Sequence, residues 1–63
     1  MKLREFFCKN VRLVDVDGKE WIGYVRTFVP AIDTDDDMDW IGLKVGSDLI
    51  EFHENEIKEI SII

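Results

Sequence analysis

A run of aspartates is the most obvious place in this sequence for metal chemistry. Five of seven consecutive residues are aspartates: Asp33, Asp35, Asp36, Asp37 and Asp39. Calcium prefers carboxylate ligands, but an EF-hand loop also needs glycine at its sixth position and glutamate at its twelfth. Counted from Asp33, those positions hold Met38 and Lys44. We predict a solvated acidic loop that discourages edge pairing or contacts a basic partner. Weak, non-specific binding of divalent ions is the alternative, and no metal site or cofactor is expected.

The single histidine, His53, and the single cysteine, Cys8, are the other side chains with catalytic potential. Catalysis would require a nucleophile or a carboxylate placed against the histidine, and a zinc site would require more ligands than these two supply. No glycine-rich phosphate loop or nucleophile motif accompanies them. We therefore predict that the protein is not an enzyme. His53 is expected on a strand surface, where Glu51 and Glu54 can raise its pKa, and Cys8 is expected to be a small buried residue.

The elements that must position these residues form one small β domain, spanning residues 1–63. We expect a short helix at about 2–9 and strands at about 11–16, 20–29, 40–45, 49–53 and 57–63. Leu3, Phe6 and Phe7 make the helical stripe, and short strands with closely spaced turns are typical of small barrels. The predicted fold is mainly β: a closed, strongly bent, five-stranded antiparallel barrel with a short N-terminal helix. Self-association would help a chain this short, which buries only about 60% of its unfolded surface.

Asp17-Gly18 predicts the sharpest turn of the chain. A two-residue hairpin turn needs backbone angles that an Asp-Gly pair adopts at low cost, so these residues should join the first two strands. Gly23, inside the second strand, indicates a bulge, a sharp bend or a close approach between backbones. Alternation places Trp21, Gly23 and Val25 on one face of that strand, and Ile22, Tyr24, Arg26 and Phe28 on the other.

The order of these elements and the residues at the turns resemble the Sm/LSm-like small-barrel family, within the wider SH3-like group, as a divergent bacterial-type member. The residues that match its first motif are Val11, Leu13, Gly18, Trp21, Gly23, Val25 and Phe28. Residues 52–60, Phe-His-Glu-Asn-Glu-Ile-Lys-Glu-Ile, resemble its second motif. The resemblance implies an N-terminal helix and five strongly bent strands. It also implies rings in which the fourth strand of one subunit pairs with the fifth of the next.

The resemblance also implies positions for an RNA pocket, and this chain carries different residues there. The stacking position falls on Ala31, the asparagine position on Asp33, and the Arg-Gly pair on His53 and Glu54. Alanine has no face for stacking, a contribution of about 1–3 kcal/mol per base. Carboxylates cannot donate hydrogen bonds, and histidine lacks the permanent forked cation of arginine. The resemblance therefore favours the family fold over the family's usual RNA pocket.

The net charge of −6 is unevenly distributed. Residues 1–32 carry six basic and four acidic side chains, a balance of +2, whereas residues 33–59 carry two basic and ten acidic side chains, a balance of −8. Because Lys and Arg drive phosphate binding, an acidic chain is a poor non-specific nucleic-acid binder. No apolar run approaches the roughly 20 residues of a membrane span, and no secretion signal opens the sequence. We expect a cytoplasmic protein with no membrane partner.

These observations favour a non-catalytic interaction or self-assembly module whose partner is another copy or another protein. The residues expected at its assembly edges are Leu49, Glu51, His53, Ile60 and Ile62. The residues expected at an interaction surface are Trp40, Asp35, Asp36 and Asp37. Packing of Trp40 against the helix is the alternative for that residue. A second hypothesis is RNA binding through a basic surface formed by Lys2, Arg4, Lys9, Arg12 and Arg26. A third is an acidic mimic that blocks a nucleic-acid-binding protein.

Overall fold

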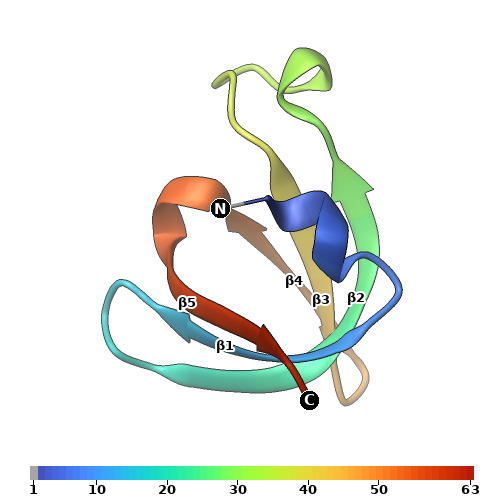
Figure 1. The fold of residues 1–63 in the computed structure, drawn as a ribbon, viewed down its shortest axis with the longest axis vertical. Coiled ribbons are helices and arrows are strands. Elements are labelled where there is room, and N and C mark those ends of the chain that lie inside the picture. The colour runs from blue at the N-terminus through green and yellow to red at the C-terminus, as the bar shows by residue number, and fades with distance from the viewer. Residues whose placement is uncertain (1) are drawn as a thin grey trace.

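A computed structural model describes residues 2–63 of the protein. Along the chain the elements are η1 (Leu3–Phe6), β1 (Asn10–Asp15), β2 (Glu20–Val29), η2 (Ala31–Asp33), β3 (Trp40–Val45), β4 (Asp48–His53), η3 (Glu54–Glu56) and β5 (Ile57–Ile62), where η is a 3-10 helix (Figure 1). The five antiparallel strands form one strongly curled sheet, so the predicted mainly β class is confirmed.

The sheet is open, which corrects the prediction of a closed barrel. Its strand order is β4-β3-β2-β1-β5, and every neighbouring pair is antiparallel. Within residues 2–63, β4 and β5 share no ladder. The short η3 turn leads from the end of β4 into β5, and β5 pairs with β1 instead of turning back on β4 as a hairpin. Both edges therefore keep a row of backbone groups without a strand partner.

The N-terminal helix is shorter than the predicted span of about 2–9. η1 is a single four-residue 3-10 turn. It ends before Cys8, which takes a positive φ of 62°, and the chain then pairs with β2. Cys8 N donates to Val25 O, and Val25 N donates to Lys9 O, each at 2.9 Å. Leu3 is fully buried. Cys8 is exposed, so the prediction of a buried cysteine was wrong. No helix in the described part of the chain has the length and apolar character needed to cross a bilayer.

Residues 16–19 connect β1 to β2, and the hydrogen bond between Asp15 and Lys19 closes a turn of three residues, 16–18, instead of the predicted two. Gly18 N donates to Asp15 O at 2.9 Å, and Asp15 N donates to Lys19 O at 3.0 Å. Gly18 has a φ of 85°, but Asp17 is not among the described residues with positive φ. A two-residue type I′ turn needs positive φ at both residues. The connection is instead a three-residue hairpin loop in which glycine takes the left-handed position.

Strand β2 bends because it pairs with two different strands. Its first half pairs with β1 as far as Tyr24, and its second half pairs with β3. The second ladder shifts register between Val25 and Thr27, which leaves Arg26 as an extra, bulged residue. The bulge changes the alternation, so Phe28 packs against the core. The predicted alternation, which placed Phe28 on the face opposite Trp21 and Val25, was therefore wrong.

Gly23 marks a close approach between backbones, one of the three alternatives that the sequence left open. A Cβ at this position would overlap the carbonyl oxygen of Lys44 on β3 and press on the Leu43 side chain. Only glycine fits here without a shift of one of the two strands.

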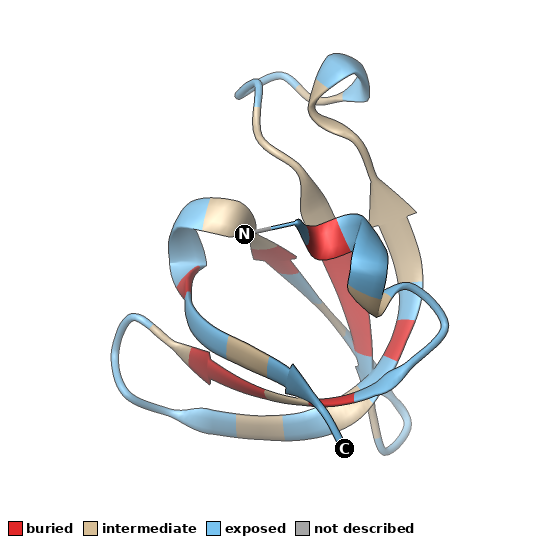
Figure 2. Ribbon diagram, in the orientation of Figure 1, coloured by how far each residue is buried: buried red, intermediate tan, exposed pale blue. Residues whose placement is uncertain are grey.

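The core lies inside the curl of the sheet (Figure 2). It is formed by buried apolar residues from η1 and all five strands: Leu3, Val11, Leu13, Val25, Ile41, Leu43, Phe52 and Ile57. Trp21 packs on this cluster edge-on to Phe52, with ring centroids 5.6 Å apart, as the sequence predicts. No polar or charged residue among residues 2–63 is buried. The polar loops and edges therefore surround an apolar core.

Candidate functional site

Residues 30–39 form a loop that projects beyond the sheet, green to yellow at the top of Figure 1. Pro30 follows the last residue of β2, where a residue without an N–H ends the ladder. Asp39 closes the base of the loop. Its Oδ1 accepts from Ala31 N at 2.7 Å, and its carbonyl oxygen accepts from Glu54 N at 3.0 Å. The base of the loop is therefore fastened to η2 and to η3.

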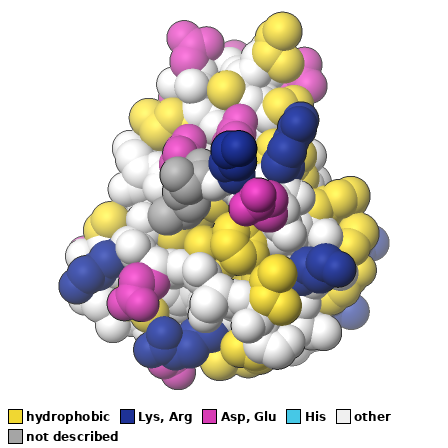
Figure 3. All heavy atoms as spheres, viewed as in Figure 1, with side chains coloured by type: hydrophobic (Ala, Val, Ile, Leu, Met, Phe, Trp, Pro, Cys, Tyr) yellow, Lys and Arg dark blue, Asp and Glu magenta, His cyan; other side chains and the backbone are white. Residues whose placement is uncertain are grey.

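Inside the loop, Thr34 is the central polar residue. Its Oγ1 lies 3.0 Å from the Ala31 carbonyl oxygen and 2.9 Å from that of Met38, and it accepts from Met38 N at 3.2 Å. Asp37 takes a left-handed φ of 57°, which aspartate tolerates better than most residues. The loop is thus folded on itself, and its acidic side chains gather at the upper tip of the molecule (Figure 3).

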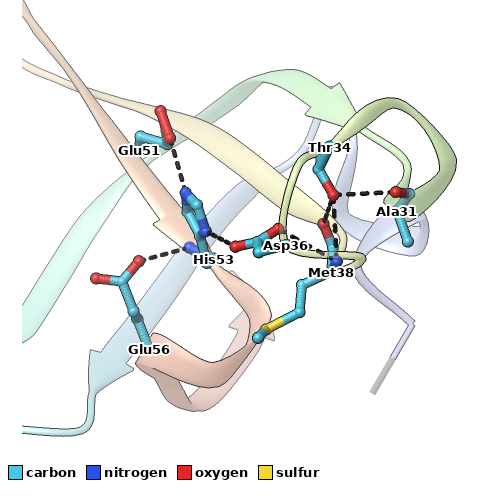
Figure 4. Close-up of polar contacts among 7 residues, drawn as sticks. All are labelled: Ala31, Thr34, Asp36, Met38, Glu51, His53 and Glu56. Atoms are coloured by element: carbon cyan, nitrogen blue, oxygen red, sulfur yellow. Dashed lines mark hydrogen bonds and ion pairs between the residues drawn. The ribbon is translucent and has the colours of Figure 1, made fainter.

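His53, the last residue of β4, is bonded at both ring nitrogens (Figure 4). Nδ1 lies 2.5 Å from Asp36 Oδ2 in the loop, and Nε2 lies 2.8 Å from Glu51 Oε1 on the same strand. The Glu51 and Asp36 carboxylates raise the pKa of His53 above its ordinary value of 6.5 because nearby anions favour the imidazolium. The same contact lowers the pKa of Asp36 below its ordinary 3.8. The sequence predicts that Glu51 and Glu54 raise the pKa of His53. In the structure, Asp36 has this effect in place of Glu54.

Trp40 stacks on His53. The two residues lie directly opposite each other on β3 and β4. Their ring centroids are 5.9 Å apart and their planes are inclined by 12°. The stack restricts rotation of the imidazole, so its nitrogens stay directed at the two carboxylates.

The loop and the adjoining ends of β3 and β4 border a hollow of about 300 Å³. Its lining residues are Asp33, Thr34, Asp35, Asp36, Trp40, Glu51 and His53. All of these except Thr34 were singled out from the sequence, but in three separate groups: pocket equivalents, an interaction surface and an assembly edge. The structure brings them together in one place, which we call the acidic hollow.

The remaining predicted site residues lie elsewhere. Ala31 and Glu54 do not line the acidic hollow, so the four positions equivalent to the family RNA pocket do not meet there. Asp37 belongs to the loop but not to the lining. The other edge residues lie on the two edge strands: Leu49 on β4, and Ile60 and Ile62 on β5.

The acidic hollow holds an imidazole between carboxylates. In the described chain, no group of three or more His, Cys, Asp or Glu side chains is arranged to hold a metal ion. The two ring nitrogens of His53 already face Asp36 and Glu51, and the Thr34 hydroxyl is engaged inside the loop. The chemistry that this arrangement supports is exchange of the imidazole proton.

A second hollow, of about 310 Å³, lies between the N-terminal segment and the end of β2; we call it the basic hollow. Its lining residues are Lys2, Arg4, Phe28, Pro30 and Asp39. The sequence indicated the basic residues but not their position beside an aromatic ring. Arg12, from the same predicted basic surface, is paired with Glu20 at 2.5 Å.

Sequence reasoning missed the contact between His53 and Asp36. Strand alternation places Glu51 and His53 on one face of β4, and this signal was available. Nothing local indicates Asp36, which is 17 residues from His53 in a loop that Thr34 and Asp39 shape.

Comparison of the chain with protein-family models, with curated proteins and with solved structures gave no match.

Proposed function

We propose that the protein is a non-catalytic interaction module that assembles with copies of itself by pairing β4 of one copy with β5 of the next. The observation that carries this proposal is the open sheet, in which β4 and β5 are the two edges. Unpaired edges present rows of N–H and C=O groups that recruit another strand. Both strands are six residues long, so they can pair over their full length.

The charges on the two edges favour pairing of unlike edges. β4 carries Asp48 and Glu51, whereas β5 carries Lys58 next to Glu59. Two β4 strands would bring acidic side chains together, and like charges opposite each other destabilise a strand pair. A contact between unlike surfaces repeats from copy to copy and closes a ring when the rotation allows it. Pairing of this kind is also what the resemblance to the Sm/LSm-like family implies.

Apolar side chains at the edges support the same pairing. Leu49 on β4 and Ile62 on β5 are each 55% exposed. Ile62 lies opposite Val11, which is fully buried, so the Ile62 side chain continues the core side of the sheet. A strand added at this edge would cover Ile62, and burial of apolar surface contributes about 25 cal/mol per Å².

A pair of matched isoleucine variants tests the proposed edge. Ile62→Lys places a charge where the added strand would cover it, whereas Ile32→Lys makes the same change in the loop, at a side chain that is 89% exposed. Sedimentation equilibrium should show that Ile62→Lys weakens self-association by at least about tenfold, or 1.4 kcal/mol. Ile32→Lys should associate like the unchanged chain. Equal association of all three proteins would contradict the proposal, as would an unchanged chain that stays monomeric.

RNA binding is a second candidate function, and the basic hollow is the observation that favours it. Lys2 and Arg4 line this hollow together with Phe28. Cations that neutralise phosphates beside an aromatic face that stacks on a base are the usual parts of a single-strand site. This site would not use the positions equivalent to the family pocket.

Titration with labelled oligo-uridine and with mixed RNA tests the second candidate. We expect salt-sensitive binding that Arg4→Gln weakens, because each phosphate contact contributes a slope of about −0.7 in log K against log salt for a single strand. Arg26→Gln is the matched control, since Arg26 is exposed and does not line the hollow. Absence of salt-sensitive binding would reject RNA binding. An equal loss in both variants would reject the basic hollow as its site.

A further inference from the structure

The tip of the acidic loop, residues 33–38, has a single polar tie to the sheet. The backbone bonds of Asp33 and Thr34 run to Pro30 and Ala31, and those of Met38 run to Thr34 and Asp36, so all of them stay inside the loop. Across residues 2–63, the one hydrogen bond or ion pair that joins this tip to a strand is between His53 Nδ1 and Asp36 Oδ2 (Figure 4).

The two carboxylate contacts of His53 together require a doubly protonated ring. Asp36 and Glu51 are acceptors when ionised, and they face different nitrogens of His53 at 2.5 and 2.8 Å. Imidazolium donates from both nitrogens, but neutral imidazole has only one N–H, and its other nitrogen carries a lone pair. When the ring loses a proton, a lone pair must therefore face one of the two carboxylates. One of the two contacts is then lost.

The loop contact is the one that we expect to break. Glu51 lies on a strand that stays paired with β3, so its release would free only a side chain. Release of Asp36 would free the backbone of residues 33–38, which gains far more conformational entropy. Neutral His53 can keep its remaining N–H on Glu51.

We propose that His53 is a pH-sensitive latch, which holds the acidic loop against β4 while the ring is doubly protonated and releases the loop when the ring becomes neutral.

The surroundings of His53 favour the latched form. The titratable groups around it, from the loop, β4 and η3, are Asp33, Asp35, Asp36, Glu51, Glu54 and Glu56. All of them are acidic, and β3 contributes Trp40, which does not titrate. The basic residues Lys2 and Arg4 line the other hollow, not this one. The raised pKa of His53 agrees with this environment and extends the latched state to pH values above 6.5.

The latch shares His53 and Glu51 with β4, the strand that the proposed self-assembly pairs, but the two proposals are tested by different measurements. Its residues belong to one copy of the chain, and its release is a change in loop mobility, which is measurable in a monomer or in an assembly. Loop mobility reports on the latch, and mass in solution reports on edge pairing. The two proposals can therefore fail separately.

NMR relaxation across the titration of His53 tests the latch. The His53 pKa is first measured from its ring resonances, and backbone order parameters of residues 33–38 are then compared well below and well above that pKa. We expect values near 0.85 in the latched state and below about 0.6 after release. Order parameters that stay the same across the titration overturn the proposal.

Three variants make the test specific. Asp36→Ala should leave the loop mobile at every pH, whereas Asp35→Ala, its matched neighbour in the acidic hollow, should behave like the unchanged chain. Glu51→Gln should keep the loop latched at high pH. The reason is that a glutamine amide can donate to the unprotonated Nε2 while Nδ1–H still donates to Asp36. A rigid loop in Asp36→Ala, or release of the loop in Glu51→Gln, would overturn the proposed mechanism.

Discussion

Asp15 organises the turn between β1 and β2. Its Oδ1 accepts from the backbone N–H groups of Asp17 and Lys19, each at 2.9 Å, and its Oδ2 accepts from Trp21 Nε1 at 3.0 Å. These hydrogen bonds hold the pKa of Asp15 below its ordinary value of 3.8, and the bond from Trp21 has the largest effect. Since Trp21 packs on Phe52, the carboxylate ties the turn to the core.

Substitution Asp15→Asn tests this role. The amide retains one acceptor oxygen, so it cannot serve both the backbone groups and Trp21, and we expect a lower thermal unfolding midpoint at neutral pH. A carboxyl with a lowered pKa in the folded state stabilises the fold above its unfolded pKa and loses that contribution as the pH falls through the folded value. The difference between Asp15→Asn and the unchanged chain should therefore shrink once the pH falls below 3.8.

Circular dichroism melts over this pH range measure the effect. Asp17→Asn, in the same turn, is the control, because the Asp17 side chain makes no hydrogen bond in the described structure. An Asp15→Asn midpoint equal to that of the unchanged chain would show that the carboxylate does not stabilise the turn.

At the scale of elements, β2 gives the sheet its curl. The strand leaves β1 and joins β3 across the bulge at Arg26, and it passes close to β3 at Gly23. Glycine has a sequence signal, so the close approach was predictable. The bulge was not predictable, because an arginine between Val25 and Thr27 is equally compatible with a regular strand. This is why Phe28 was assigned to the wrong face.

Gly23→Ala and Gly42→Ala compare two kinds of contact. The new Cβ at position 23 meets the Lys44 carbonyl oxygen, a backbone atom, whereas at position 42 it meets the side chains of Thr27 at 3.2 Å and Leu49 at 3.3 Å. Gly23→Ala should reduce the free energy of unfolding by about 1–3 kcal/mol, as overpacking does. Gly42→Ala should cost less, because the Leu49 side chain is half exposed and can move. Urea denaturation measures both, and the reverse order would contradict the close approach of β2 and β3.

Most of the fold was predictable because it depends on local patterns. The strands lie within one residue of their expected positions, since alternation and turn residues mark them. The closed barrel was wrong because closure depends on whether β4 and β5 meet, which no local pattern reports. The acidic hollow could not be predicted for the same reason. Its residues stand out individually, but their meeting depends on the fold of the loop over the end of β4.

At the scale of the whole molecule, two features bear on assembly: the distribution of charge and the position of the two sheet edges. In Figure 3, Asp and Glu side chains lie at the tip, and Lys and Arg side chains, with further Asp and Glu side chains among them, lie over the body below it. The two edge strands lie at opposite ends of the strand order, with the curl of the sheet between them. One copy therefore has two unlike edges, as the proposed pairing of β4 with β5 requires.

The mass of the unchanged chain in solution tests the edge-pairing account most directly. A single chain has a mass of 7.4 kDa. Light scattering over increasing protein concentration should show masses that are multiples of this value, as expected when the edges of successive copies pair. A mass of 7.4 kDa at every concentration, up to about 1 mM, would contradict the account, because such edges would then bind each other more weakly than about 4.1 kcal/mol.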